Sequence, residues 1–289
     1  MSLGSPRPAA RPGRARQRWI GVAIDDVFLP NWDKDPARRT VKIQPEDVDA
    51  LLAAQERYSK MLAPDRFRFL LGFCSGWYGR IADRRFDDAA GDRALVRHRE
   101  AFQWFDHLPG HQVACNYSED ELVAFMHQSR QWARDHDVLP FTSRFAVSPA
   151  HKGIHPIYDP VYRAWRAVWN VRCSATPGVD RGFEHLGIKV APRYNIGLWA
   201  SQHGRDQLAP GQNVIASAEG GRLFKKVVQS PALLIVSHQA NYARDRLALV
   251  LLDRLLAHLV DRTDFRLRTG PHEELVEQHF RLENGDRMS

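Results

Sequence analysis

The chain has 289 residues, of which 44% are hydrophobic, and carries 41 lysines and arginines against 34 aspartates and glutamates. This composition is ordinary for a globular protein and excludes wholesale disorder. No apolar run approaches the roughly 20 residues needed to cross a bilayer, so no membrane span is expected. The three cysteines are too few and too far apart for a disulfide framework or a CxxC metal site.

The net charge of +7 suggests a nucleic-acid partner, but the distribution of that charge argues against one. Residues 1–18 contain five arginines and no acid, and without them 36 basic residues face 34 acidic ones. The body is therefore close to neutral, and no nucleic-acid partner is expected. The tail is rich in Pro, Gly, Ala and Arg and lacks the apolar core of a secretory signal, so we expect it to be disordered. Without a signal, a cytoplasmic location is the default expectation.

Strand-like and helix-like stretches alternate along the body, beginning with the apolar, β-branched run Trp19–Ile24. A helix is predicted for Pro45–Met61 and a second strand for Phe67–Phe73. Ser118 and Glu121 form a capping box before an apolar helical pattern. Later strands are predicted at Arg144–Ser148, Trp169–Cys173, Leu186–Ala191, Leu233–Ser237 and Phe265–Thr269, with helices at Asp159–Val168 and Asp245–Val260. This alternation predicts an α/β fold with a mostly parallel sheet, open or closed into a barrel.

Two adjacent carboxylates, Asp25 and Asp26, follow the first predicted strand. In a β/α barrel, the carboxyl ends of the strands carry the functional side chains. Neighbouring side chains of an extended chain cannot point the same way, so one carboxylate could hold a metal while the other faces substrate. A turn with solvated acids is the simpler alternative for an isolated pair.

His107 and His111 are four residues apart, which places both imidazoles on one face of a helix or a wound turn, as metal ligands require. Thirteen histidines give about half such a pair by chance, so surface or capping histidines are the simpler alternative. His151 and His155 share the spacing, but a glycine and a proline argue against a helix there. His238 follows a predicted strand, where a barrel would place either a catalytic side chain or a structural rim histidine.

Asp26, His107 and His111 would together give two imidazoles and one carboxylate with open coordination positions. Zinc uses such a set for hydrolysis, and non-heme iron uses it to activate oxygen. The neighbouring Asp25 favours zinc hydrolysis, because that chemistry needs a general base beside the metal-bound water. The sequence contains no phosphate-binding P-loop, no GxGxxG run and no GxSxG elbow.

Longer segments around these residues form a consistent pattern in chain order. They are Arg18–Phe28 (RWIGVAIDDVF), Asp87–Asp92 (DDAAGD), Phe102–His111 (FQWFDHLPGH), Val147–Asn170, Arg181–Arg193, Gly220–Leu249, Leu267–Pro271 and Glu277–Phe280. Together they resemble the N-deacetylase domain of heparan sulfate N-deacetylase/N-sulfotransferases, a branch similar to the carbohydrate esterase 4 polysaccharide deacetylases. The resemblance implies a distorted (β/α) barrel of the polysaccharide deacetylase (NodB-like) type, formed as a single domain by residues 19–289.

The resemblance also implies a role for each candidate residue. Asp25 corresponds to the catalytic base, and His238 to the general acid that protonates the leaving amine. Asp26, His107 and His111 correspond to the ligands of Zn²⁺ or another divalent metal. The implied reaction removes the N-acetyl group from N-acetylglucosamine units of an anionic, heparan sulfate- or heparosan-like glycosaminoglycan and releases acetate.

Five further matched positions are expected to bind substrate or support the site: Arg193, His151, Asn241, Tyr242 and Arg246. Arg193 could orient or charge-balance Asp25, since an arginine fork suits a carboxylate, and a scaffold salt bridge is the alternative. His151 falls in a loop where the family carries two adjacent histidines, the first of which is Ala150 here.

The sulfotransferase half of the bifunctional family members has no counterpart in this sequence, so deacetylation alone is expected. Two other functions remain as alternatives. A non-catalytic glycan-binding protein with the same fold would not need the whole set of candidate catalytic residues. A non-heme iron oxygenase with two histidines and one carboxylate fits the β/α order less well. The sequence indicates no oligomeric state.

Overall fold

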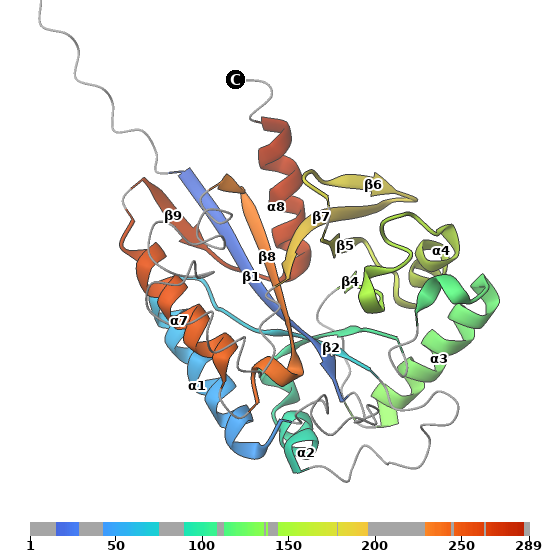
Figure 1. Cartoon of the computed structure of the whole chain (residues 1–289), viewed down its shortest axis with the longest axis horizontal. Coiled ribbons are helices and arrows are strands. Elements are labelled where there is room, and N and C mark those ends of the chain that lie inside the picture. Colours follow the sequence, from blue (N-terminus) through green and yellow to red (C-terminus); the bar gives the residue numbers. More distant parts are fainter. Residues whose placement is uncertain are drawn as a thin grey trace, which may run out of the picture.

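A computed structural model describes residues 16–28, 43–74, 90–108, 113–135, 137, 144–177, 179–195, 229–243, 246–262 and 264–285. Its strands are β1 (Arg16–Val27), β2 (Leu70–Phe73), β3 (Gln103–Asp106), β4 (Phe145–Ala146), β5 (Cys173–Thr176), β6 (Phe183–His185), β7 (Ile188–Asn195), β8 (Ala232–His238) and β9 (Phe265–Arg268). Its α-helices are α1 (Pro45–Met61), α2 (Ala90–Arg97), α3 (Glu119–Asp135), α4 (Asp159–Trp169), α7 (Leu247–Val260) and α8 (His272–Gly285). Strands and helices alternate along much of the chain (Figure 1).

The strands form one sheet in the order β3-β2-β1-β8-β7-β5-β4, in which all neighbours run parallel. β9 pairs in parallel with the first residues of β1, and β6 pairs antiparallel with β7. The two end strands approach each other, since the rings of Phe105 in β3 and Phe145 in β4 lie 5.5 Å apart. The sheet therefore curls into a nearly closed barrel, which confirms the predicted α/β barrel in a single domain.

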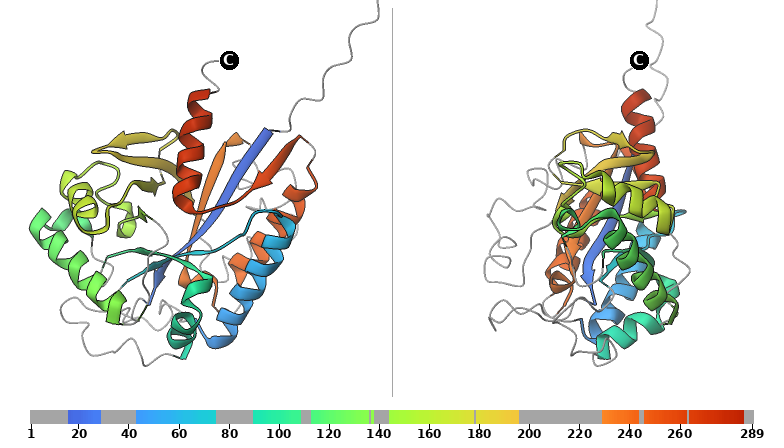
Figure 2. Two further views of the ribbon diagram at one scale, coloured as in Figure 1. Left: turned by 180° about the vertical axis from the view of Figure 1, so that it is seen from behind. Right: turned by 90° about the vertical axis from the view of Figure 1, so that its right-hand side faces the viewer.

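The helices cover the barrel in separate groups (Figures 1 and 2). α1 and α7 lie side by side against one face of the sheet, and α3 and α4 pack against each other on the far side of the molecule. α8 contacts β1, β5, β7 and β8. It lies at the edge where β1 begins, opposite the edge where the parallel strands end (Figure 1).

Alternation along β1 divides the core into two clusters. Ile20, Val22 and Ile24 pack with residues of α1 and α7, whereas Trp19 and Ala23 pack with residues of α3, α4 and α8. Because both faces of β1 are buried, its sequence is a nearly continuous apolar run, as expected of a central parallel strand. Asp25 lies two residues after Ala23 and therefore on the same face of β1. The alternation of side chains thus directs the Asp25 carboxylate into the barrel.

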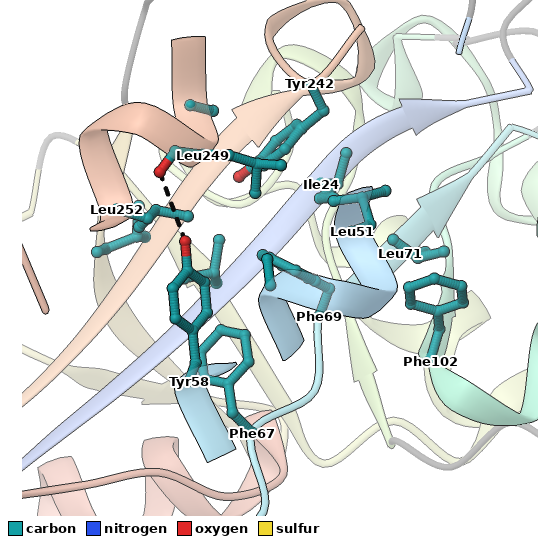
Figure 3. Packing of buried hydrophobic residues seen from close by; sticks show 14 of the residues in the cluster. Ile24, Leu51, Tyr58, Phe67, Phe69, Leu71, Phe102, Tyr242, Leu249 and Leu252 are labelled. Carbon is teal, nitrogen blue, oxygen red and sulfur yellow. Dashed lines mark hydrogen bonds between the residues drawn. The ribbon is translucent and has the colours of Figure 1, made fainter. Parts of the chain in front are cut away.

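Aromatic side chains join α1 and α7 to the sheet (Figure 3). The Tyr58 ring makes edge-on contacts with Phe67 at 5.2 Å and Phe69 at 6.3 Å, and its hydroxyl donates to the Leu249 carbonyl of α7 at 3.5 Å. Such aromatic pairs stabilise a fold by about 0.5–1.5 kcal/mol beyond the burial of their area. These contacts hold α1 and α7 against one face of the sheet.

Two predicted helices are confirmed in detail. α1 spans Pro45–Met61, the predicted range, with Pro45 in the tolerated first turn. Ser118 and Glu121 form the predicted capping box: the Ser118 N–H donates to the Glu121 carboxylate at 2.8 Å, and the Glu121 N–H donates to Ser118 Oγ at 3.4 Å. α3 begins directly after this box, at Glu119.

Other boundaries differ from the predictions. The strand predicted at Trp169–Cys173 is wrong, because α4 continues through Trp169 and ends at Asn170, whose φ of 53° caps the helix. The strand in this region, β5, begins only at Cys173. Arg16–Arg18 belong to β1 and pair with β9, although the sequence assigns them to the disordered tail. Residues 1–15 of that tail lie outside the described residues.

Four of the strands and α-helices in the described ranges were not predicted: α2, β3, β6 and α8. β3 is only four residues long and fully buried, so its sequence shows neither the period of a strand nor that of a helix. None of the helices in the described ranges is long and apolar enough to cross a bilayer.

Candidate active site

The candidate catalytic residues meet at the edge of the barrel where the parallel strands end. Asp25 and Asp26 lie near the end of β1, His107 follows β3, and His238 is the last residue of β8. Asp25 and His238 are register partners on neighbouring strands. This is the edge at which β/α barrels present functional side chains.

A bulge at the end of β1 allows both carboxylates to face one imidazole. The β1–β2 register shifts between Ile24 and Val27, and Asp26 has a φ of 62°, outside the extended range of a strand. The Nε2 atom of His107 lies 3.5 Å from Asp26 Oδ1 and 4.0 Å from Asp25 Oδ2. The expectation that neighbouring side chains diverge holds for an extended chain, and the bulge removes that condition here.

His107 is oriented by a backbone carbonyl. Its Nδ1 atom lies 2.7 Å from the carbonyl oxygen of Val147, and because a carbonyl only accepts, Nδ1 must donate. Nε2 is therefore the nitrogen that faces the carboxylates. Burial lowers the pKa of His107, but the charges of Asp25 and Asp26 outweigh burial, so the pKa is raised above its ordinary value. The residue follows a strand and is not in a helix or a wound turn, contrary to the prediction from its spacing.

Asp25 is paired with a buried arginine. Arg193, in β7, donates from Nη2 to Asp25 Oδ1 at 2.7 Å, and neither side chain is more than 3% exposed. Burial raises the pKa of Asp25, but the positive charge of Arg193, together with its hydrogen bond and the nearby imidazoles, outweighs burial and lowers the pKa. Asp25 is consequently an ionised carboxylate at neutral pH.

His238 lies on the more open side of the cluster. Its Nε2 atom is 3.8 Å from Asp26 Oδ2, and its side chain is 19% exposed, against 2% for His107 and 3% for Asp25. A group approaching from solvent therefore meets His238 and Asp26 before it meets Asp25.

A buried carboxylate that the sequence did not single out lies directly behind His107. Asp106 accepts hydrogen bonds from Ser129 Oγ at 2.7 Å, Trp169 Nε1 at 2.9 Å and the Leu108 N–H at 3.1 Å. Burial raises the pKa of Asp106 to about 6, even though these donors lower it. The network ties the end of β3 to α3 and α4. The available signal in the sequence was the position of Asp106 next to His107, a candidate ligand. The donors Ser129 and Trp169 are distant from Asp106 in the chain, so the sequence did not reveal them.

The remaining predicted residues occupy different surroundings. Burial, followed by the charge of Arg193, lowers the pKa of His151 to about 3, and the ring also interacts electrostatically with Asp25. Asn241 is buried and donates from Nδ2 to Ser237 Oγ at 2.6 Å. Tyr242 is wholly buried in the core beside α1, and Arg246, whose side chain is 37% exposed, donates to Asp47 at 2.8 Å.

The donor groups around His107 fit a divalent metal. Two ligands of one tetrahedral zinc ion, each about 2.1 Å from the metal, lie about 3.4 Å from each other. The 3.5 Å between Asp26 Oδ1 and His107 Nε2 matches that separation. A ligand histidine also normally donates its other ring N–H to a carbonyl or carboxylate, as His107 does to Val147.

His111, the third predicted ligand, lies outside the described residues. Within the described ranges, no three His, Cys, Asp or Glu side chains form a group suited to a metal ion.

Comparison with known proteins identifies a family with a matching sequence. Residues 17–224 match the family described as heparan sulfate-N-deacetylase, deacetylase domain. The chain is 36% identical to bifunctional heparan sulfate N-deacetylase/N-sulfotransferase 1 of Caenorhabditis briggsae, over 91% of this chain and 30% of that protein. It is 32% identical to human bifunctional heparan sulfate N-deacetylase/N-sulfotransferase 2, over 92% of this chain and 30% of that protein. The chain thus spans about a third of the length of these relatives.

A solved structure supports the fold independently of close sequence similarity. The carbohydrate deacetylase Agd3 superimposes with a TM-score of 0.72 at 15% identity, over 92% of this chain and 54% of that chain. At this identity the likeness concerns the fold alone. It agrees with the polysaccharide deacetylase barrel that the sequence predicted.

Proposed function

The chain belongs to the family of heparan sulfate-N-deacetylase deacetylase domains, and on this premise we propose that it is a metal-dependent polysaccharide N-deacetylase. Its proposed substrate is an anionic polymer of the heparan sulfate or heparosan type, from which it releases acetate. The observation that carries the proposal is the convergence of Asp25, Asp26, His107 and His238 at the carboxyl edge of the barrel.

Asp26, His107 and His111 are the proposed ligands of the metal ion, which we assign as zinc. Such an ion, when bound, polarises the amide carbonyl and makes a water molecule more acidic. The protein's contribution is to keep the ligands in place. The Val147 carbonyl fixes the tautomer and direction of the His107 ring, and the bulge at Asp26 brings its carboxylate to the same point.

Asp25 is the proposed general base. Its pKa is lowered, so the carboxylate is ionised at neutral pH and can accept a proton from the attacking water as the new C–O bond forms. The hydrogen bond from Arg193 occupies Oδ1. Asp25 Oδ2, the atom 4.0 Å from His107 Nε2, is left facing the proposed ligands and is the oxygen placed to take the proton.

His238 is the proposed general acid. It donates a proton to the amide nitrogen as the C–N bond breaks, so the products are acetate and a glucosamine unit with a free amine. The partial exposure of its ring suits a group that must reach a bound polymer and recover its proton from solvent. Buried Asn241 supports this segment through its bond to Ser237, the residue before the acid.

His151, Tyr242 and Arg246 are proposed to support the site rather than to contact substrate. Arg246 joins the start of α7 to Asp47 of α1, near the strand ends that carry the catalytic groups. His151 is held neutral beside the Asp25–Arg193 pair, because its lowered pKa of about 3 keeps a further positive charge away from that pair at neutral pH.

The test is a direct assay of acetate release. Purified protein is incubated with an N-acetylated glucuronic acid–glucosamine polymer, with zinc or with a chelator, and both acetate and free amine are measured. We expect equimolar release of the two that zinc restores after chelation. A folded, zinc-loaded sample that binds the polymer without releasing acetate would instead indicate a glycan-binding protein. Bound iron together with oxygen consumption would indicate an oxygenase.

Asp25→Asn separates the proposed base from the proposed ligands. This variant should lose at least 10²-fold in kcat, the usual contribution of a general base, while it still binds zinc. Asp253→Asn, which removes an exposed partner of Arg57, is the matched control and should keep full activity. Loss of zinc from Asp25→Asn would show that the base and ligand roles are wrongly assigned.

A further inference from the structure

The side chain of Gln239 connects two strand ends that carry the proposed catalytic groups. Gln239 directly follows His238 at the end of β8 and is fully buried. Its Oε1 atom accepts a hydrogen bond from the backbone N–H of Phe28, at 3.2 Å, across 211 residues of sequence. Phe28 lies just beyond β1, two residues after Asp26, so this bond spans the cluster from one strand end to the other.

The end of β1 has a backbone shape that needs external support. Asp26 and Phe28 have φ values of 62° and 67°, which are unfavourable for residues with a Cβ atom. Such conformations persist when surrounding contacts hold them. Here the Val27 carbonyl accepts from the Cys74 N–H at 2.8 Å, the Phe28 ring stacks on Trp104 at 5.7 Å, and Gln239 accepts from the Phe28 N–H.

Stability alone does not explain a glutamine at this position. Gln239 is 0% exposed, and its Nε2 atom has no hydrogen-bond acceptor among the described residues. A buried amide with unmet donors is unfavourable relative to a hydrocarbon side chain of similar size. The group that Gln239 does satisfy is the Phe28 N–H, in the segment that aims the two carboxylates.

We propose that Gln239 is a positioning residue: by holding the Phe28 N–H, it fixes the bulge that directs Asp26 and sets the distance between Asp26 and His238. The geometry links these groups directly, because His238 Nε2 lies 3.8 Å from Asp26 Oδ2 and Gln239 is the next residue after His238. The expected effect on zinc binding and catalysis rests on the proposed deacetylase function. The expected effect on the backbone at the end of β1 does not depend on that function.

The test compares Gln239→Leu with Gln55→Leu. Gln55 in α1 is a matched control, because its buried Oε1 also accepts a backbone N–H, that of Phe69 at 2.7 Å, on the helical side of β2 and away from the catalytic cluster. Three quantities are measured for each variant: amide hydrogen exchange at residues 26–28, zinc affinity by competition with a chelating dye, and kcat and KM on the N-acetylated polymer. Thermal unfolding is recorded for both variants, so that their effects are compared at a similar loss of thermal stability.

For Gln239→Leu we expect faster exchange at residues 26–28, zinc affinity weakened by about 10- to 100-fold, and a fall of similar size in kcat at saturating zinc with KM little changed. Gln55→Leu, at a comparable loss of thermal stability, should leave all three at wild-type values. If Gln239→Leu does not fold, Gln239→Asn replaces it, since this side chain keeps the amide but is one methylene too short to reach Phe28.

Wild-type exchange at residues 26–28 in the Gln239 variant, or zinc affinity and kcat within twofold of wild type, would overturn the positioning role. A wild-type protein that neither binds zinc nor releases acetate would refute the proposed function instead. In that case the exchange measurement alone decides the structural part: faster exchange in the Gln239 variant but not in the Gln55 variant supports it, and equal exchange overturns it.

Discussion

Replacing Arg193 with methionine removes the charge that faces Asp25 while keeping a side chain of similar length. The guanidinium is 0% exposed and donates from Nη2 to Asp25 Oδ1 at 2.7 Å. Its Nε and Nη1 atoms are buried without acceptors among the described residues, so Asp25 is the described partner on which its placement depends. The variant therefore leaves a buried carboxylate without its cation.

The size of the effect follows from burial. Removing one partner of a buried ion pair costs about 3–5 kcal/mol of stability, because the other charge remains uncompensated. Asp25 can avoid part of this cost by taking up a proton. An adjacent arginine lowers the pKa of a carboxylate, so we expect the pKa of Asp25 to rise in Arg193→Met.

The assay is the pH dependence of kcat/KM for acetate release. Because the proposed base must be ionised, the raised pKa of Asp25 in Arg193→Met moves the acid limb to higher pH. Activity at pH 6 should fall steeply, and activity at pH 9 should largely recover. Urea unfolding at pH 7 should show the predicted loss of stability.

Arg268→Met is the matched control. Arg268 also makes an ion pair, to Asp65 at 2.9 Å, but it lies in β9, beside the first residues of β1 and far from the catalytic edge. This variant should lose some stability and keep the wild-type acid limb. An unshifted acid limb in Arg193→Met, or an equal shift in both variants, would refute the inference that Arg193 keeps Asp25 ionised.

Two further predictions concern stability. Burial, followed by the charge of Arg193, lowers the pKa of His272 to about 3, whereas an unfolded histidine titrates near 6.5, so acid favours the unfolded state in this window. As the pH falls from 6.5 to 5, the wild type should lose about 2 kcal/mol of its free energy of unfolding through His272, and His272→Leu should not. Urea unfolding of both proteins measures this difference, and parallel pH profiles would contradict the expectation. Ser118→Ala removes the capping box with Glu121 and should cost about 1 kcal/mol in thermal unfolding without changing kcat; an unchanged melting temperature would contradict the capping role.

The helices were the elements best predicted from sequence, because their signals lie within a few residues. Pro45 in a first turn, followed by an apolar period, gave α1 its bounds, and the box of Ser118 and Glu121 gave the start of α3. The short buried strands were harder. β3 and β5 have four residues each and are fully buried, so no alternation distinguishes them, and the helix-ending conformation of Asn170 has no apolar signal.

Chain order also predicted part of the candidate site. Acids after the first strand and a histidine after a late strand must meet if the strands are parallel neighbours, and β1 and β8 do pair with Asp25 opposite His238. The spacing of His107 and His111 suggested a helix or a wound turn, whereas His107 follows a strand.

The sequence by itself therefore determined the α/β class, the main helices and the residue types available for catalysis, since these depend on local pattern and on chain order. Only the tertiary structure decided how those residues face one another. The bulge at Asp26 redirects a carboxylate, Val147 orients His107 through a carbonyl that every residue possesses, and Arg193 reaches Asp25 across 168 residues. Such contacts join groups that are distant in the chain, and they exist only once the sheet has closed around them.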